Sequence, residues 1–182
     1  MPNPNLHMTA LEITHSKTAP EIAAALETLR PSVERIVNYT VAHRTRLIKP
    51  ALGFDDQAIA LSFVPAAGEG GRSVEDDGYS YHHLRRDIWE LVQDSGVDVG
   101  SRYVVPSAHL TIGRFITNED FTKDGEGKID PEKVSGLIEV IEEVNEWLKQ
   151  DYWPKGDEGV IKEGGEWRVG REFGLECRTG TL

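Results

Sequence analysis

The sequence predicts a single domain that mixes α-helices with β-strands. Short apolar segments of strand length recur along the chain, and some of them alternate apolar and polar residues. Three stretches between them repeat apolar residues at helical spacing. No low-complexity linker divides the 182 residues, which suffice for one domain or two small, closely packed lobes.

The first predicted elements are a strand and a helix. Residues Leu6–Ile13 alternate and are rich in apolar types, which indicates a strand. Thr18 then begins a helix as its N-cap, with Glu21 at the capping-box position. We expect this helix to bend or break at Pro31 and to end near Arg44.

The middle of the chain predicts a strand, a loop, a helix and a further strand. Gln57–Val64 is apolar enough for a buried strand, and the glycine-rich stretch Gly68–Gly78 is typical of a loop. Tyr79–Gln93 carries its apolar residues on one helical face. A turn at Gly96 and Gly100 then leads into the predicted strand at residues 108–116.

The last third of the chain begins with the clearest helix. Asp130 is a favourable N-cap and Pro131 suits the first helical position, so a helix is predicted from there to about Gln150. Two short strands, Trp167–Val169 and Phe173–Cys177, are predicted to follow.

Composition and charge narrow the function classes. Residues are 38% hydrophobic and 28% charged, and no apolar run approaches the ~20 residues that span a bilayer, so no membrane partner is expected. The net charge of −11 argues against extended nucleic acid, because Lys and Arg supply most of that affinity. It leaves room for a pocket that grips one phosphate.

The charge is unevenly distributed. Residues 119–146 hold ten acidic and three basic residues, which favours a solvated helix face. Residues 30–49 hold five basic residues against Glu34 alone, so this run is either a solvated face or the flank of an anion site. The single cysteine, Cys177, allows no internal disulfide, and no signal peptide is visible, so a cytoplasmic or nuclear protein is expected.

Two His-x-Thr motifs are the main candidates for chemistry. They are His7-Met8-Thr9 and His109-Leu110-Thr111, whose histidines lie 102 residues apart (109 − 7). Residues two apart on a strand project to the same face, so each strand offers an imidazole beside a hydroxyl. The competing interpretation is two half-buried strand histidines with ordinary strand-forming threonines.

Such a set of side chains suits phosphodiester chemistry if the two strands share one cleft. A neutral His can take a proton from the attacking water, while the other, as imidazolium, protonates the departing ribose oxygen. The threonine hydroxyls can donate to the non-bridging oxygens as charge develops on them. An ordinary His pKa of about 6.5 keeps both protonation states accessible near neutral pH.

These motifs resemble the paired H-x-[TS]-x signatures of the two-histidine (2H) phosphoesterases, which include RNA 2′,3′-cyclic phosphodiesterases and LigT-like enzymes. The resemblance rests on residues 6–11 and 106–114, and Arg114 matches the H-x-T-x-x-R form of the second motif. Residues 81–86 and the glycine-rich end at 169–182 look like fungal proteins labelled RNA ligase/cyclic nucleotide phosphodiesterase. The resemblance covers nearly the whole chain, although only the His-x-Thr motifs are diagnostic of function.

The resemblance implies an α+β fold with two lobes in one domain over residues 1–182. Two antiparallel sheets would line a central cleft with helices outside, the lobes being approximately residues 1–65 with the C-terminal strands, and residues 79–150. The expected reaction opens a 2′,3′-cyclic phosphate on a nucleotide or RNA end to a 2′-phosphate, without metal or cofactor. His7 would be the base and His109 the acid. The alternatives are cleavage of linear 2′-5′ or 3′-5′ linkages and a catalytically silent nucleotide-binding module.

One departure from the family concerns the first motif. Family members usually carry a strand before it, whereas His7 lies close to the start of this sequence. The first lobe is therefore expected to lack its opening strand and to expose a strand edge. A second copy of the chain, as a homodimer, or rearranged local chain would cover this edge.

Other side chains have two interpretations each. Tyr79 and Tyr81 would stack on a base at the cleft rim or pack in the core. Arg114 would contact the phosphate, although simple alternation places it on the strand face opposite His109 unless a bulge at Gly113 re-aims it. The adjacent histidines 82 and 83 look like a metal pair, but neighbouring helical residues point in different directions, so no metal site is expected.

Overall fold

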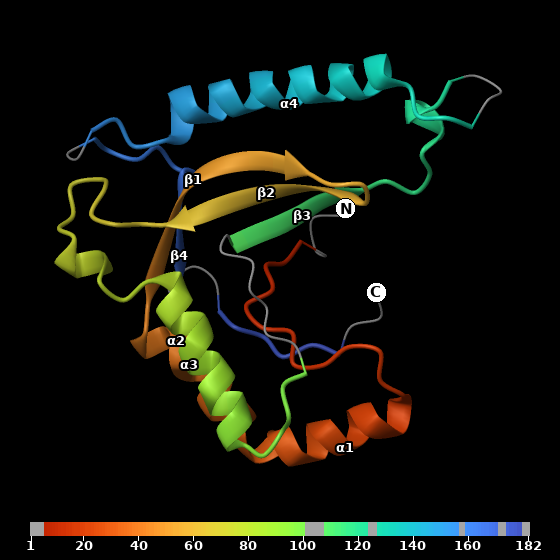
Figure 1. Ribbon diagram of the computed structural model, residues 1–182. Coiled ribbons are helices and arrows are strands. Elements are labelled where there is room, and N and C mark those ends of the chain that lie inside the picture. Colours follow the sequence, from red (N-terminus) through yellow and green to blue (C-terminus); the bar gives the residue numbers. More distant parts are fainter. Residues whose placement is uncertain (1–5, 101–107, 124–126, 157–158, 171–173, 180–182) are drawn as a thin grey trace.

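The computed structural model describes residues 6–100, 108–123, 127–156, 159–170 and 174–179. In this part of the chain, helices surround one curled, four-stranded antiparallel sheet of order β3-β2-β1-β4 (Figure 1). The architecture is therefore α+β, as predicted. The strands are β1 Thr45–Phe54, β2 Ala58–Pro65, β3 Ala108–Arg114 and β4 Glu166–Val169.

A tight hairpin joins β1 to β2. The carboxylate of Asp55 accepts hydrogen bonds from the backbone N–H groups of Gln57 and Ala58, both at 2.8 Å, and so closes the turn in the way that Asp side chains commonly do. Farther along β1, the register with β2 shifts between Ile48 and Ala51. Lys49 has a left-handed φ of 56° in this bulge.

The first predicted helix is two α-helices separated by one tight turn. α1 spans Ala19–Leu29, a 3₁₀ turn follows at Arg30–Ser32, and α2 spans Val33–Ala42. The break coincides with Pro31, which has no N–H to donate to the helix. The predicted capping box is also present, with the Glu21 carboxylate 2.8 Å from the backbone nitrogen of Thr18.

α4 begins where the sequence predicts, and α3 begins two residues later than predicted. α3 spans Tyr81–Asp94 after the N-cap Ser80, and α4 spans Pro131–Tyr152 after Asp130. The Asp130 carboxylate accepts the backbone N–H of the second helical residue at 3.0 Å. None of the helices in the described ranges is both long and apolar enough to cross a membrane.

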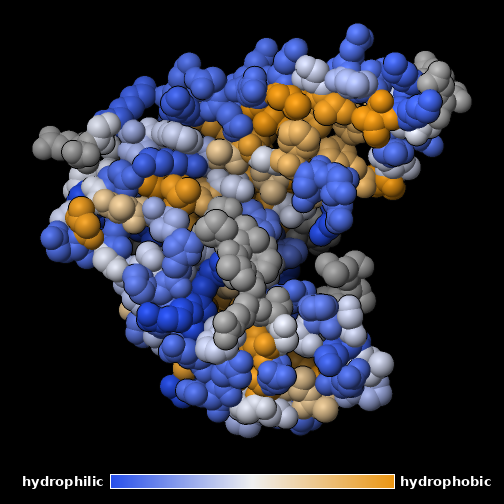
Figure 2. Space-filling model, viewed as in Figure 1, coloured by the Kyte–Doolittle hydropathy of each residue, from blue (hydrophilic) through white to orange (hydrophobic). Residues whose placement is uncertain are grey.

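The main hydrophobic core lies where α2 and α3 pack on one side of the sheet. Its members include fully buried side chains of β1, β2 and α3, namely Leu47, Phe63, Leu84, Ile88 and Val92. A band of apolar residues also lies between α4 and the sheet, while the outward surface of α4 is polar (Figure 2). The acidic run is therefore a solvated helix face, as predicted.

α4 is fastened to β1 beyond the point where β4 accompanies it. The side-chain amide of Asn145 accepts the N–H of Leu52 at 2.7 Å and donates to its carbonyl at 3.0 Å. The indole of Trp153 donates to the carbonyl of Pro50 at 2.8 Å. These contacts satisfy backbone groups that a neighbouring strand would otherwise pair.

Three strand predictions differ from the structure. β1 was not predicted at all. Of the predicted strand Phe173–Cys177, residue 173 lies outside the described residues, and residues 174–177 form no strand. Residues 6–13 are extended but join the sheet only through an isolated bridge at Met8. The described residues form one four-stranded sheet, so a second sheet remains a prediction.

Candidate active site

The two His-x-Thr segments lie side by side in antiparallel orientation. An isolated β-bridge joins Met8 to Leu110, the central residues of the two motifs. If the antiparallel register of this bridge continues by one residue on each side, His7 lies opposite Thr111 and Thr9 lies opposite His109. Side chains that face each other in such a pair have Cβ atoms about 4.5–5.5 Å apart.

Continued in this way, the register would put all four motif side chains on one face of the sheet. Met8 and Leu110 project to the other face, where Met8 packs against the core. His109 and Thr111 are half-buried on either side of the buried Leu110, and His7 is exposed. The histidines then stand on a diagonal, which in a regular antiparallel pair spans about 7–8 Å. That spacing leaves room for a phosphate between two rings.

β2 adds a polar group that was not predicted. Ser62 pairs with His109 across β2 and β3, and Ala60 pairs with Thr111. Opposed residues share a face, so the Ser62 hydroxyl lies beside the His109 imidazole, while Ala60 leaves space next to Thr111. Ser62 is the only hydroxyl residue in the β2 sequence, a signal that the sequence does carry.

A bulge in β3 decides where Arg114 projects. The β2–β3 register shifts between Ile59 and Ala60, so β3 carries one extra residue between Thr111 and Gly113. Beyond it, Arg114 pairs with Ala58, which is on the same face of β2 as Ala60. Arg114 therefore shares the sheet face of His109 and Thr111, contrary to simple alternation. The bulge proposed near Gly113 is confirmed.

The surroundings of His109 favour its neutral form. Burial is the main cause that lowers its pKa, and the positive charge of Arg85 lowers it further, while Asp55 partly opposes both. The pKa of the Asp55 carboxyl is itself lowered, mainly by the hydrogen bonds that it accepts in the β1–β2 turn. The positive charge of Arg114 lowers this pKa further. Charged groups from α3 and from the β1–β2 turn thus act on one histidine.

Arg85 also holds the first motif segment in place. Its Nε donates to the carbonyl of Ala10 at 2.9 Å, one residue after the motif. Its guanidinium lies 5.9 Å from the ring centre of Tyr81 on the same helix. Sequence reasoning missed this role, because a bond across 75 residues of chain leaves no local signal.

The tyrosines proposed to stack on a base are engaged elsewhere. Tyr81 is 2% exposed and belongs to the core, so the stacking prediction for this residue is wrong. Tyr79 is half-buried, and its hydroxyl donates to the Asp87 carboxylate at 2.7 Å. Burial and this carboxylate raise the Tyr79 pKa strongly. Its polar end is thus committed to Asp87.

One of the two adjacent histidines of α3, His83, caps the start of the helix. Both are exposed, and His83 Nδ1 accepts the backbone N–H of the N-cap Ser80 at 3.1 Å. Within the described ranges, no three His, Cys, Asp or Glu side chains are grouped so that they could hold a metal ion.

Comparisons with protein-family models, with curated proteins and with solved structures gave no match to this chain. The 2H resemblance therefore rests on the motif residues themselves.

Proposed function

We propose that this chain is a two-lobed, metal-independent phosphodiesterase of the 2H type. It would hydrolyse 2′,3′-cyclic phosphates of nucleotides or RNA ends to 2′-phosphates. The supporting observation is the antiparallel bridge between Met8 and Leu110, because its register, continued by one residue on each side, would bring two imidazoles and two hydroxyls to one sheet face. Arg114 joins them through the bulge in β3.

In the proposed reaction, water attacks phosphorus opposite the 3′-oxygen. One histidine takes the water proton while the P–O3′ bond breaks, and the other gives its proton to the leaving O3′. Thr9, Thr111 and Arg114 would donate to the non-bridging oxygens as negative charge builds up there. The Ser62 hydroxyl, beside His109, would orient that ring.

The acid and base roles can be argued from the surroundings of His109. The resemblance implies that His7 is the base, but the lowered His109 pKa favours the neutral imidazole that a base requires. We therefore assign the base role to His109 and the acid role to His7. A 4-nitrophenyl phosphodiester needs no leaving-group protonation, so it separates the two assignments. His7→Ala should retain much more activity on this substrate than His109→Ala.

The central test is hydrolysis of 2′,3′-cyclic nucleotides in the presence of EDTA. Each of His7→Ala and His109→Ala should lose roughly 10²–10⁴-fold in kcat. His82→Ala, which changes an exposed histidine of α3, is the matched control and should retain full activity. Tight nucleotide binding without turnover would instead identify a silent binding module. Cleavage confined to linear 2′-5′ or 3′-5′ linkages would change the substrate but keep the site.

A homodimer through the N-terminal strand edge stays a prediction. Size-exclusion chromatography with light scattering tests it, since a monomer at all concentrations would contradict it.

A further inference from the structure

A second pocket lies at the opposite edge of the sheet, where β1 begins beside β4. It has a volume of about 140 Å³, several times the ~30 Å³ share of one water molecule. We call it the arginine pocket, because the charged residues lining it are four arginines and two aspartates: Arg44, Arg46, Arg72, Arg168, Asp76 and Asp77. β1 and β2 separate it from the motif residues of β3.

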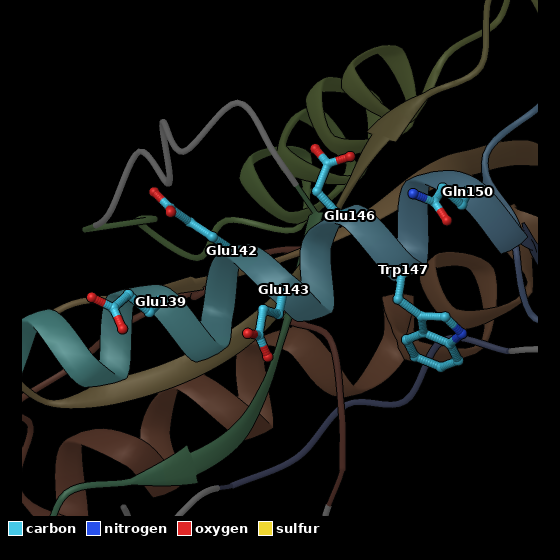
Figure 3. A pocket seen from close by; sticks show the side chains of 6 residues that line it. All are labelled: Glu139, Glu142, Glu143, Glu146, Trp147 and Gln150. Carbon is cyan, nitrogen blue, oxygen red and sulfur yellow. The ribbon is translucent and has the colours of Figure 1, made fainter.

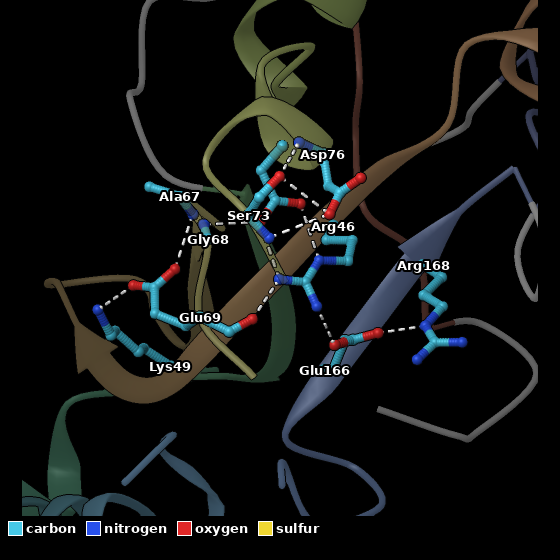
Figure 4. Close-up of polar contacts among 10 residues, drawn as sticks. Arg46, Lys49, Ala67, Gly68, Glu69, Ser73, Asp76, Glu166 and Arg168 are labelled. Carbon is cyan, nitrogen blue, oxygen red and sulfur yellow. Dashed lines mark hydrogen bonds and ion pairs between the residues drawn. The ribbon is translucent and has the colours of Figure 1, made fainter. Parts of the chain in front are cut away.

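Two of the four arginines are neutralised within the protein. Arg46 makes a two-pronged contact with the Asp77 carboxylate, each hydrogen bond 2.8 Å long, and also binds Glu166 at 2.7 Å (Figure 4). Arg168 pairs with the same Glu166 carboxylate. Although burial opposes it, the contact with Arg46 keeps the pKa of Asp77 below its ordinary value. The positive charges of these two arginines and the negative charges of these two carboxylates therefore cancel.

The other two arginines remain available. Neither Arg44 nor Arg72 forms an ion pair with another described residue, and Arg44 Nε donates only to the neutral carbonyl of Val41, at 3.2 Å. Asp76 is the one remaining lining carboxylate, and it accepts the N–H and hydroxyl of Ser73. The pocket thus keeps a surplus positive charge in a protein whose net charge is −11.

The free arginines give this pocket the chemistry of an oxyanion site. Guanidinium groups match the oxygens of a phosphate or another dianionic oxyanion, because their planar N–H groups can donate to two oxygens at once.

We propose that the arginine pocket binds a small phosphate dianion, either free phosphate or the terminal group of a phosphate monoester. This site is separate from the His-Thr face and does not depend on the reaction proposed there. Its size and the protein's overall negative charge suit a small anion better than an extended polyanion. The other open groove, along the outer face of α4, is lined by four glutamates and would repel such a ligand (Figure 3).

The test is calorimetric titration with inorganic phosphate and with methyl phosphate at constant ionic strength. It is done on the wild-type chain and on Thr111→Ala/Arg114→Gln, which removes two of the groups proposed to bind phosphate at the candidate active site. We expect saturable binding in both proteins, and comparison of the two ligands distinguishes free phosphate from a monoester. Absence of binding at millimolar concentrations of both ligands would overturn the proposal.

Two arginine variants localise the site. Arg72→Gln and Arg44→Gln should each weaken binding at least about tenfold, as expected for loss of a charge-assisted contact. Arg35→Gln removes the same charge from an exposed position on α2 outside the pocket, so its affinity should stay within twofold of wild type. Equal affinities of all three variants would show that any bound phosphate lies elsewhere and would overturn the assignment.

Discussion

The polar groups at the two edges of this sheet are arranged in different ways. At the β1–β4 edge, Arg46 and its acidic partners are buried and bonded to one another at 2.7–2.8 Å. At the β3 edge, the histidines and threonines of the two motifs are half-buried or exposed; two of them belong to β3 and two to a segment joined to it by one isolated bridge. Buried groups that satisfy one another stabilise a fold, whereas polar groups that reach the surface can contact a ligand.

The largest effect is expected at the buried cluster. Arg46→Met leaves the Asp77 and Glu166 carboxylates buried without their main partner, so it should lower the free energy of unfolding by about 3–5 kcal/mol. Urea denaturation measures this loss. Arg168→Gln, at a side chain with 35% exposure, is the control and should cost less than about 1 kcal/mol. Similar losses in both variants would contradict the distinction between the two arginines.

Arg114 should show the reverse behaviour. It is exposed, so Arg114→Gln should change stability by no more than about 0.5 kcal/mol. If it contacts the scissile phosphate, kcat/KM should fall roughly 10–100-fold. Arg178→Gln, an exposed position paired with Glu176 near the other end of the chain, controls for the loss of charge. A fully active Arg114→Gln would remove this residue from the site.

Arg85 connects fold and site, so its variant should affect both. Arg85→Gln removes the bond to Ala10 and a positive charge that lowers the His109 pKa. We expect a higher His109 pKa, measured by NMR titration of the imidazole, together with reduced activity. Arg86→Gln, the exposed neighbour on α3, should leave that pKa unchanged. A His109 pKa insensitive to Arg85→Gln would show that the two residues are not electrostatically coupled.

The smallest effect concerns pH. Because burial lowers the folded-state pKa of His109, the unfolded chain takes up this proton first as the pH falls. Titration of His109 therefore leaves the free energy of unfolding unchanged above the ordinary pKa of about 6.5. As the pH falls below that value toward the folded-state pKa, the titration lowers the free energy of unfolding. Denaturation curves of wild type and His109→Asn at several pH values between 7.5 and 5 (roughly one unit either side of that pKa) should diverge in this sense. Parallel curves would contradict a lowered pKa.

Local signals predicted most of the helices and part of the site. Helix starts after Thr18 and Asp130 depend on caps within a few residues, and strand alternation predicted that each His shares a face with its Thr. β1 was missed because Pro50 and a bulge interrupt its pattern. The Arg46 partners lie 31 and 120 residues away in sequence, so no local pattern could have revealed them.

The extra residue in β3 has a consequence for how such motifs are found. His109 and Arg114 are five positions apart, an odd number, so counting along a single strand puts them out of phase. The pairing with β2 shows that both side chains are on the same face. One residue of β3 between them has no partner in β2, so the alternation shifts by one position there. Two side chains can therefore meet at one point although their spacing has the wrong parity. The register with the adjacent strand, and not the spacing in the sequence, determines which side chains share a face.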